Sequence, residues 1–343
     1  MPEPRDVVAD LKRIAFLLEA MREPNFRVNA FRRAAKAVAE LPPEELAERT
    51  RRGTLRDLPG VGEVLARTIA ESVRGEEPVY LRRLEATGGQ PIVEGGAELL
   101  AALKGDCHVH SDWSDGGSPI REMAAAAAEL GREWMVLTDH SPRLTVANGL
   151  SAERLEEQLD LVAQLNAELQ PFRILTGIEV DINEDGSLDQ RPDLLARLDI
   201  VVGSVHSLLR MEERPMTERM ITALADPHLD ILGHCTGRMK TRNRNRPPSA
   251  FDPELVFAAA KRFDKAIEIN SRPERLDPPK RLLRLAVEAG CRVAIDSDAH
   301  APGQLAWLPI GCERAAACGV PEASVVNAWE ADALLDWARS HAP

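Results

Sequence analysis

The hydrophobic pattern of the chain changes near residue 105. Before that point, apolar residues recur at spacings of three and four, as in "DVVADLKRIAFLLEAM" and "NAFRRAAKAVAEL", which is typical of amphipathic helices. The stretch "LRDLPGVGEVLARTIAESVRG" then places two helical segments around a Pro-Gly-x-Gly turn. We therefore expect a small all-α domain over residues 1–85 and a linker over residues 86–104.

After this point, short apolar runs alternate with helical segments such as "IREMAAAAAELG" and "DPELVFAAAKRF". The runs with strand character are "DCHVH", "EWMVLTDH", "FRILTGIEV", "LDIVVGSVH", "LDILGH", "KAIEIN" and "CRVAIDSDAH". Strands separated by helices form parallel βα units. Residues 105–343 are therefore predicted to form an α/β fold, either a barrel or a doubly wound sheet.

Each predicted strand ends in a polar side chain that can bind metal, except the one that ends in Asn270. In a parallel barrel, the C-terminal ends of the strands converge at one mouth. His108 and His110 lie two residues apart on a strand, so both can face the same ion. The side chains at or just after these ends that can bind metal are six histidines and at least three acids, drawn from His108, His110, Asp115, Asp139, His140, Glu179, Asp181, His206, His234, Glu268, Asp298 and His300.

Imidazoles and carboxylates together suit Zn²⁺, Mn²⁺ or Fe²⁺. Because so many ligands are present, we expect two or three divalent ions, an arrangement that activates water and binds phosphoryl oxygens during phosphate-ester hydrolysis. A single histidine is often a buried, hydrogen-bonded core residue. Of the 8 histidines, however, only His228 and His341 lie outside this set. Four polar residues in or beside these strands could orient the ligands or could simply be buried, hydrogen-bonded structure: Asp106, Asp139, Glu268 and Asn270.

The motifs "CHVHSDWSDG", "LTDHS", "GIEVDI", "GSVHS", "LGHCTGR", "EINSRPERLD" and "DSDAHAPGQL" resemble those of the PHP (polymerase and histidinol phosphatase) superfamily, and most of all the PHP domain of bacterial family X DNA polymerases. The resemblance implies a distorted (βα)7 barrel with a trinuclear metal centre. It implies a first ion, and catalytic roles, for His108, His110, Glu179 and Asp298. Glu179 would bridge to a second ion held by His206 and His234, and the third ion would be held by Asp115, His140 and His300.

A basic segment, "TGRMKTRNRNRPPS", follows His234. After a strand end it would overhang the metal mouth, where guanidinium groups bind phosphate through charge and paired hydrogen bonds. The alternative is a solvated, flexible loop. Arg238 lies nearest the ligand and matches the family motif, so we assign it a catalytic phosphate contact. Arg242 and Arg244 are candidate DNA contacts.

Residues 58–71, "LPGVGEVLARTIAE", resemble a helix-hairpin-helix, in which Gly60 and Gly62 would let the turn approach a DNA phosphate. The segment "FRVNAFRRAAKAVAELP" resembles the N-terminal domain of beta-type DNA polymerases. Arg27 and Arg67 are candidate DNA contacts, as are Arg32 and Arg33, although these arginines could equally well solvate a helix face.

Two departures from that resemblance matter. Thr68 stands where beta-type enzymes carry a Schiff-base lysine, so we expect no lyase activity. Nothing between residues 85 and 105 could hold the paired aspartates of a polymerase palm, so we also expect no polymerase activity.

Composition narrows the class of protein further. The chain of 343 residues has a net charge of −12, which argues against a protein that coats nucleic acid by bulk charge, although local basic patches remain compatible. Its five scattered cysteines fit a reducing compartment. No apolar run is long enough for a membrane span and the start lacks an apolar signal core, so we expect a cytoplasmic protein with no membrane contact.

These features together predict a multinuclear-metal-dependent phosphoesterase that acts on DNA. It would be a 3′-5′ exonuclease or 3′-end-processing phosphatase in DNA repair, binding ends or single strands without sequence preference. A separate repair polymerase is a candidate partner. One alternative is a small-molecule phosphatase of the histidinol-phosphate type. Another is a non-catalytic DNA-binding or scaffold protein, which would require lost ligands, whereas all nine positions carry a competent ligand.

Overall fold

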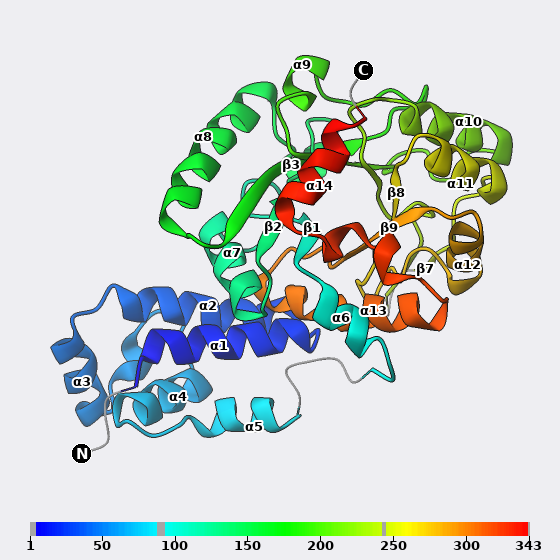
Figure 1. Cartoon of the computed structure of the whole chain (residues 1–343). Coiled ribbons are helices and arrows are strands. Elements are labelled where there is room, and N and C mark those ends of the chain that lie inside the picture. The colour runs from blue at the N-terminus through cyan, green and yellow to red at the C-terminus, as the bar shows by residue number, and fades with distance from the viewer. Residues whose placement is uncertain (1–4, 88–92, 242–244, 342–343) are drawn as a thin grey trace. The chain divides into compact units, whose positions relative to one another are not determined.

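The computed structural model describes residues 5–87, 93–241 and 245–341. Contacts within the chain divide it into two compact units, Met1–Ile92 and Val93–Pro343 (Figure 1). The predicted linker at 86–104 contains this boundary and also the short helix α6 (Ala97–Ala102).

The first unit is all-α, as the three- and four-residue apolar spacing predicts. Its core is formed by the buried faces of the helices, which include Leu11, Phe31 and Ile69. Asp6 caps the first helix by accepting a hydrogen bond from the Ala9 amide at 3.0 Å. The helices are α1 (Val7–Ala20), α2 (Asn25–Ala39), α3 (Pro43–Arg52), the 3₁₀ turn η1 (Leu55–Asp57), α4 (Glu63–Val73) and α5 (Val79–Thr87).

The second unit contains a parallel sheet of seven strands in the order β1-β2-β3-β4-β5-β8-β9. A parallel bridge between Val109 and Ala299 and a hydrogen bond from the Cys107 amide to Asp296 Oδ1, 2.9 Å long, bring the first and last strands together. The sheet is thus a nearly closed barrel, which confirms the predicted α/β class. Its strands are β1 (Gly105–Val109), β2 (Trp134–Leu137), β3 (Arg173–Asp181), β4 (Ile200–Ser204), β5 (Ile231–Leu232), β8 (Ala266–Asn270) and β9 (Arg292–Asp296).

Helices surround the barrel (Figure 1). They are α7 (Ile120–Glu129), α8 (Ala152–Glu168), α9 (Pro192–Leu195), α10 (Glu213–Leu224), α11 (Pro253–Arg262), α12 (Lys280–Glu288), α13 (Leu308–Ala317) and α14 (Ala331–Arg339). The 3₁₀ turns are η2 (Thr145–Ala147), η3 (Pro302–Trp307), η4 (Glu322–Ser324) and η5 (Val326–Ala328). None of the helices in the described part of the chain has the length and apolar composition needed to cross a bilayer.

Helix α14 covers one end of the barrel. Its Leu334 and Trp337 pack in one apolar cluster with Trp134, Ile200 and Ala266, which are the first residues of their strands. The N-terminal ends of the strands are therefore covered by apolar packing. The polar residues gather at the opposite, C-terminal ends.

The basic segment after His234 contains a short antiparallel pair of strands, β6 (Met239–Lys240) and β7 (Asn245–Arg246). The sequence pattern did not predict this hairpin. Two of the predicted DNA contacts, Arg242 and Arg244, lie outside the described residues.

Candidate metal centre

Strand β1 and the loop after it supply three of the candidate ligands. His108 and His110 are fully buried, and their ring centroids lie 5.0 Å apart on one side of the strand. Asp115 follows on a tight loop, in which a Cβ on Gly116 would lie 2.6 Å from the backbone of Ser111. Glycine at 116 therefore permits the turn that brings Asp115 back towards the histidines.

A buried carboxylate fixes the same loop. Asp139, two residues after β2, accepts hydrogen bonds from the amide of Ser111 at 2.8 Å and from its hydroxyl at 2.6 Å. The hydroxyl of Ser114 and the side-chain amide of Gln158 also donate to Asp139. Asp139 is thus occupied with holding the loop that carries Asp115.

Glu179 on β3 lies at the centre of the site and is 1% exposed. Its carboxylate lies 2.9 Å from His140 Nδ1 and 2.9 Å from His234 Nε2. It also lies 3.3 Å from His206 Nε2 and 3.4 Å from His108 Nε2. Burial alone would raise the pKa of this carboxyl, but the surrounding imidazoles hold the pKa of Glu179 well below its usual range. The carboxylate is therefore ionised and contacts several of the candidate histidine ligands at once.

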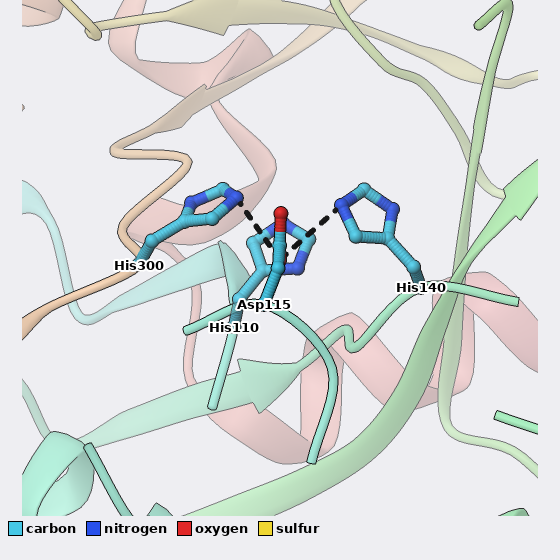
Figure 2. A group of neighbouring side chains, drawn as sticks. All are labelled: His110, Asp115, His140 and His300. Carbon is cyan, nitrogen blue, oxygen red and sulfur yellow. Dashed lines mark ion pairs between the residues drawn. The ribbon is translucent and has the colours of Figure 1, made fainter. Parts of the chain in front are cut away.

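A second group gathers around Asp115 (Figure 2). The imidazoles of His300 and His140 flank its carboxylate, with Nε2 atoms 3.3 and 3.6 Å from Oδ1, and the ring of His110 lies close by. Burial, together with the neighbouring His300 and His140, lowers the pKa of His110 well below its usual value. A neutral imidazole is the form that binds a metal ion.

Asp298 follows β9 in a left-handed backbone conformation, with φ of 53°, which is strained for a residue other than glycine. Its Oδ1 lies 3.6 Å from His110 Nε2, and its Oδ2 accepts a hydrogen bond from the side-chain amide of Asn270 at 3.0 Å. Burial opposes ionisation, but Arg275 and Arg272 hold the pKa of Asp298 well below its usual range. The strain therefore places an ionised carboxylate beside the histidines.

The residues present fit a group of divalent cations. Among the described residues, buried imidazole nitrogens of His110, His206 and His234 lack a hydrogen-bond partner, although buried polar atoms are normally paired. Three sets of side chains bring one ligand atom each to within 4.8 Å of the others: His110, Asp115, His140 and His300; His108, His110 and Glu179; and His140, Glu179 and His206. Imidazole and carboxylate donors in such sets suit Zn²⁺, Mn²⁺ or Fe²⁺.

These sets overlap more than the predicted division into three ions. His110 belongs to the set around Asp115 as well as to the set with His108, and His140 contacts Glu179 directly. The structure brings all nine predicted ligands to one end of the barrel. The assignment of individual ligands to individual ions stays a prediction.

Of the four residues for which the sequence left two readings, Asp106, Glu268 and Asn270 contact ligands, and Asp139 holds the loop that carries Asp115. Glu268 Oε1 lies 2.6 Å from His108 Nδ1, and Asn270 donates to both Glu268 and Asp298. Asp106 accepts hydrogen bonds from the backbone amides of His108 and Ser297. Together with Asp139 they form the hydrogen-bonded shell that orients the ligands.

Two arginines in the loop after β8 were missed as site residues. Arg272 Nη1 lies 2.9 Å from His300 Nδ1 and donates to the carbonyl of Asp298 at 3.0 Å. Arg275 Nε lies 2.9 Å from Asp298 Oδ2. Both belong to the quoted motif "EINSRPERLD", directly after a predicted strand, and that position was the available signal.

The other predicted contacts are placed as follows. Arg238 is half-buried, and its amide donates to Thr236 Oγ1 at 3.3 Å. In the first unit, Gly60 has a positive φ of 78°, as the predicted turn requires, and Arg67 is exposed on α4. Arg27 contacts the Tyr80 hydroxyl at 2.6 Å and pairs with Glu23, so its guanidinium is held by its own unit.

Comparison with known proteins gives matches for both units. Residues 106–272 match the PHP domain and residues 3–77 match a helix-hairpin-helix domain. The DNA polymerase/3′-5′ exonuclease PolX of Bacillus subtilis is 42% identical over 229 residues, which are 67% of this chain and 40% of that protein. The chain thus spans less than half of the Bacillus protein.

Other relatives are smaller. A "probable phosphatase" of Caldanaerobacter subterraneus is 30% identical over 221 residues, which are 61% of this chain and 80% of that protein. Among solved structures, a histidinol phosphate phosphatase from Lactococcus lactis, determined with zinc, L-histidinol and phosphate, is 20% identical, with a TM-score of 0.47, over 64% of this chain and 95% of that one. From the matched domains and relatives, the chain belongs to the PHP family of metal-dependent phosphoesterases and carries a helix-hairpin-helix domain before its barrel.

Proposed function

We propose that this protein is a hydrolase that uses two or three divalent ions to cleave phosphate esters at DNA 3′ ends, as a 3′-5′ exonuclease or a 3′-end-processing phosphatase. The observation that carries the hydrolytic part is the carboxylate of Glu179, which lies within 3.4 Å of four imidazoles. Several buried nitrogens of this cluster have no hydrogen-bond partner. Because buried polar atoms are normally paired, bound cations would supply the missing contacts.

In this proposal, the nine predicted ligands hold the ions, and His108, His110, Glu179 and Asp298 take the catalytic roles. Bound ions would supply Lewis-acid stabilisation of the phosphoryl oxygens and an activated water. The protein itself orients the ligands, since Glu268 holds the imidazole of His108 and Asn270 holds the carboxylate of Asp298. These two ligands are thus held by a second contact before substrate arrives.

Arginines at the mouth would bind the substrate phosphate. Arg272 and Arg275 lie against Asp298, so their guanidinium groups border the ligands directly. Arg238, which the sequence favours, follows the β5 ligand His234 at a distance of four residues. Guanidinium groups suit this role because they stay charged and donate paired hydrogen bonds to phosphate oxygens.

DNA as the substrate is supported by the helix-hairpin-helix match over residues 3–77 and by the 42% identity to the Bacillus PolX protein. The turn at Gly60 and Gly62 precedes α4, whose first amides face no intrahelical acceptor and can meet a phosphate. Arg67 on α4 would add charge, and contacts of this kind carry no sequence preference. We further propose a cytoplasmic role in DNA repair, without polymerase activity and beside a separate repair polymerase.

A small-molecule phosphatase is the second candidate. It is favoured by the Caldanaerobacter relative, which shares 80% of its length with this chain. The ligand set would serve that reaction equally well, but the helix-hairpin-helix domain would then lack a role. A non-catalytic scaffold is disfavoured because each of the nine ligand positions carries a competent side chain.

The deciding experiment is a digestion of 5′-labelled oligonucleotides that end in a 3′-hydroxyl or a 3′-phosphate, with Mn²⁺ and Zn²⁺ tested side by side. Histidinol phosphate is assayed in parallel, and His108→Ala is the inactive control. We expect metal-dependent trimming of the 3′ end that the variant lacks. Intact DNA together with rapid phosphate release from histidinol phosphate would replace the proposal by the small-molecule function.

A further inference from the structure

A groove opens beside the metal centre, between the loop that follows β4 and the segment that precedes α11. It encloses about 710 Å³, which lies within the range of small-molecule and nucleotide sites, about 300–1,000 Å³. The residues that define its chemistry are His206, Leu209, Arg210, Met211, Arg246 and Pro247. We refer to it as the β4–α11 groove.

His206 connects the groove to the site of chemistry. Its imidazole lines the groove and also lies 3.3 Å from Glu179. A molecule whose phosphate reaches the metal ligands can therefore extend into the groove without leaving the surface of the protein. The groove is thus placed to bind the part of the substrate next to the scissile phosphate.

The wall after β4 is held rigidly. The buried guanidinium of Arg219 donates hydrogen bonds to the carbonyls of Ile182, at 3.1 Å, and Ser207, at 3.0 Å. Ser249, from the other wall, donates to the carbonyl of Leu209 at 2.8 Å. The two walls are therefore tied together, and the groove exists before any ligand binds.

The same loop contains a strained residue at the mouth. Leu208 has a positive φ of 52° and leaves 52% of its side chain exposed, although it lies only two positions after His206. An exposed leucine in a left-handed conformation costs stability on both counts. Such strain beside a functional site is often retained because it gives the neighbouring residues their positions.

The groove combines three kinds of chemistry. Arg210 is exposed and forms no ion pair with the described carboxylates. Arg246 adds a second guanidinium, whose Nε donates to the carbonyl of Gly237 at 2.6 Å. Leu209, Met211 and Pro247 provide apolar surface. The carboxylates of Glu212 and Glu213 also line the groove and can accept hydrogen bonds from amino or hydroxyl groups.

We propose that the β4–α11 groove binds the nucleotide unit adjacent to the scissile phosphate, with Arg210 and Arg246 on the next phosphate of the strand. A nucleotide matches the three kinds of chemistry, since it offers a phosphate to the arginines, a flat base to the apolar residues, and amino and hydroxyl donors to the glutamates. A small phosphomonoester has no second phosphate to offer. The inference rests on the proposed nuclease function and names the specificity-determining residues for it.

The test compares two substrates for the full-length, Mn²⁺-loaded protein. They are a single-stranded oligonucleotide and p-nitrophenyl phosphate, which occupies only the metal centre. For Arg210→Ala and for Pro247→Glu, we expect the ratio of kcat/KM for the oligonucleotide to that for p-nitrophenyl phosphate to fall about tenfold, through KM. Pro247 is exposed, so its substitution tests the groove without disturbing a buried contact.

Arg214→Ala is the matched control. Arg214 lies four residues after Arg210, is 88% exposed and pairs with Glu218, outside the groove. Its substitution should leave the ratio unchanged. An unchanged ratio in both groove variants, or an equal fall for both substrates, would overturn the inference while leaving the nuclease function in place.

A binding measurement separates the inference from the proposed function. The probe is fluorescein-labelled trithymidylate with phosphorothioate linkages, which slow hydrolysis, followed by fluorescence anisotropy. If the wild type fails to cleave DNA, the proposed function falls. Binding about tenfold weaker in Arg210→Ala would still support a nucleotide groove. Equal binding by both proteins would reject it.

Discussion

The Nδ1 atom of His108 lies 2.6 Å from Oε1 of Glu268, and both side chains are fully buried. The contact turns the other ring nitrogen, Nε2, towards Glu179 at 3.4 Å. The second oxygen of Glu268 accepts the backbone amide of His234, which is another ligand candidate. One carboxylate that faces no ion site directly therefore orients two histidines from different strands.

Glu268→Gln should weaken metal binding. Glutamine keeps the shape of the side chain but removes the negative charge that makes the His108 imidazole a stronger metal ligand. Loss of such a partner typically lowers metal affinity about 10–100-fold. Calorimetric titration with Mn²⁺ measures the change. Glu254→Gln, at an exposed position on α11, is the matched control. Equal affinities for the two variants would mean that Glu268 has only a structural role.

The pH dependence of the protein's stability should change sign when metal binds. Burial favours neutral His206, but the carboxylates of Glu179 and Asp181 outweigh it and raise the pKa of His206 to about 9. A pKa raised in the folded state stabilises the fold fully below the unfolded value of about 6.5, and this stability is lost as the pH rises through about 9. Metal binding instead requires the deprotonated ring and should strengthen over the same range.

Thermal unfolding between pH 6.5 and 9 tests this expectation. The wild type in EDTA should lose stability relative to His206→Gln, which cannot titrate, and the Mn²⁺-loaded wild type should gain stability. Parallel curves for wild type and variant in EDTA would show that His206 does not bind a proton in the metal-free site.

Much of the fold was predictable because each barrel strand is a short run, mostly of apolar residues, between amphipathic helices. All residues of β1, β2, β4 and β8 are buried. The hairpin of β6 and β7 was not predictable, since its two-residue strands lie in a polar, arginine-rich segment with no hydrophobic period. Helix α6 is only six residues long and escaped notice in the predicted linker for a similar reason.

The ligands could be gathered from sequence because parallel strands bring their C-terminal ends together. Which ligands belong to more than one group could not be predicted from sequence. His140 reaches Glu179 as well as Asp115, and that depends on the depth at which each side chain enters the mouth. Arg275 was missed because its contact with Asp298 follows from the path of a loop, for which an alternating pattern gives no guide.

Arg275→Lys should lower kcat about 100-fold, in line with the loss of a charge-stabilising donor at a transition state. Lysine keeps the charge but lacks the planar fork that can hold Asp298 and a phosphate oxygen together. The assay uses p-nitrophenyl phosphate, and metal content is measured in the same samples so that loss of ions is not mistaken for loss of catalysis. Arg284→Lys, exposed on α12, is the control. Full activity at full metal content would remove Arg275 from the proposed phosphate site.

Gly62→Ala should weaken DNA binding without unfolding the first unit. Gly62 has φ of −81°, which any residue adopts, and an added Cβ meets no protein atom within 4 Å, so a methyl group there would obstruct only a DNA backbone. Gly53→Ala should instead lower stability without affecting DNA binding. Gly53 ends α3, away from the hairpin turn, and its φ of 71° should make alanine cost about 1–2 kcal/mol of folding free energy. Anisotropy with a labelled 20-mer and thermal unfolding should therefore separate the two variants: binding falls in Gly62→Ala, and stability falls in Gly53→Ala. Wild-type binding by Gly62→Ala would place the DNA contact elsewhere on the chain.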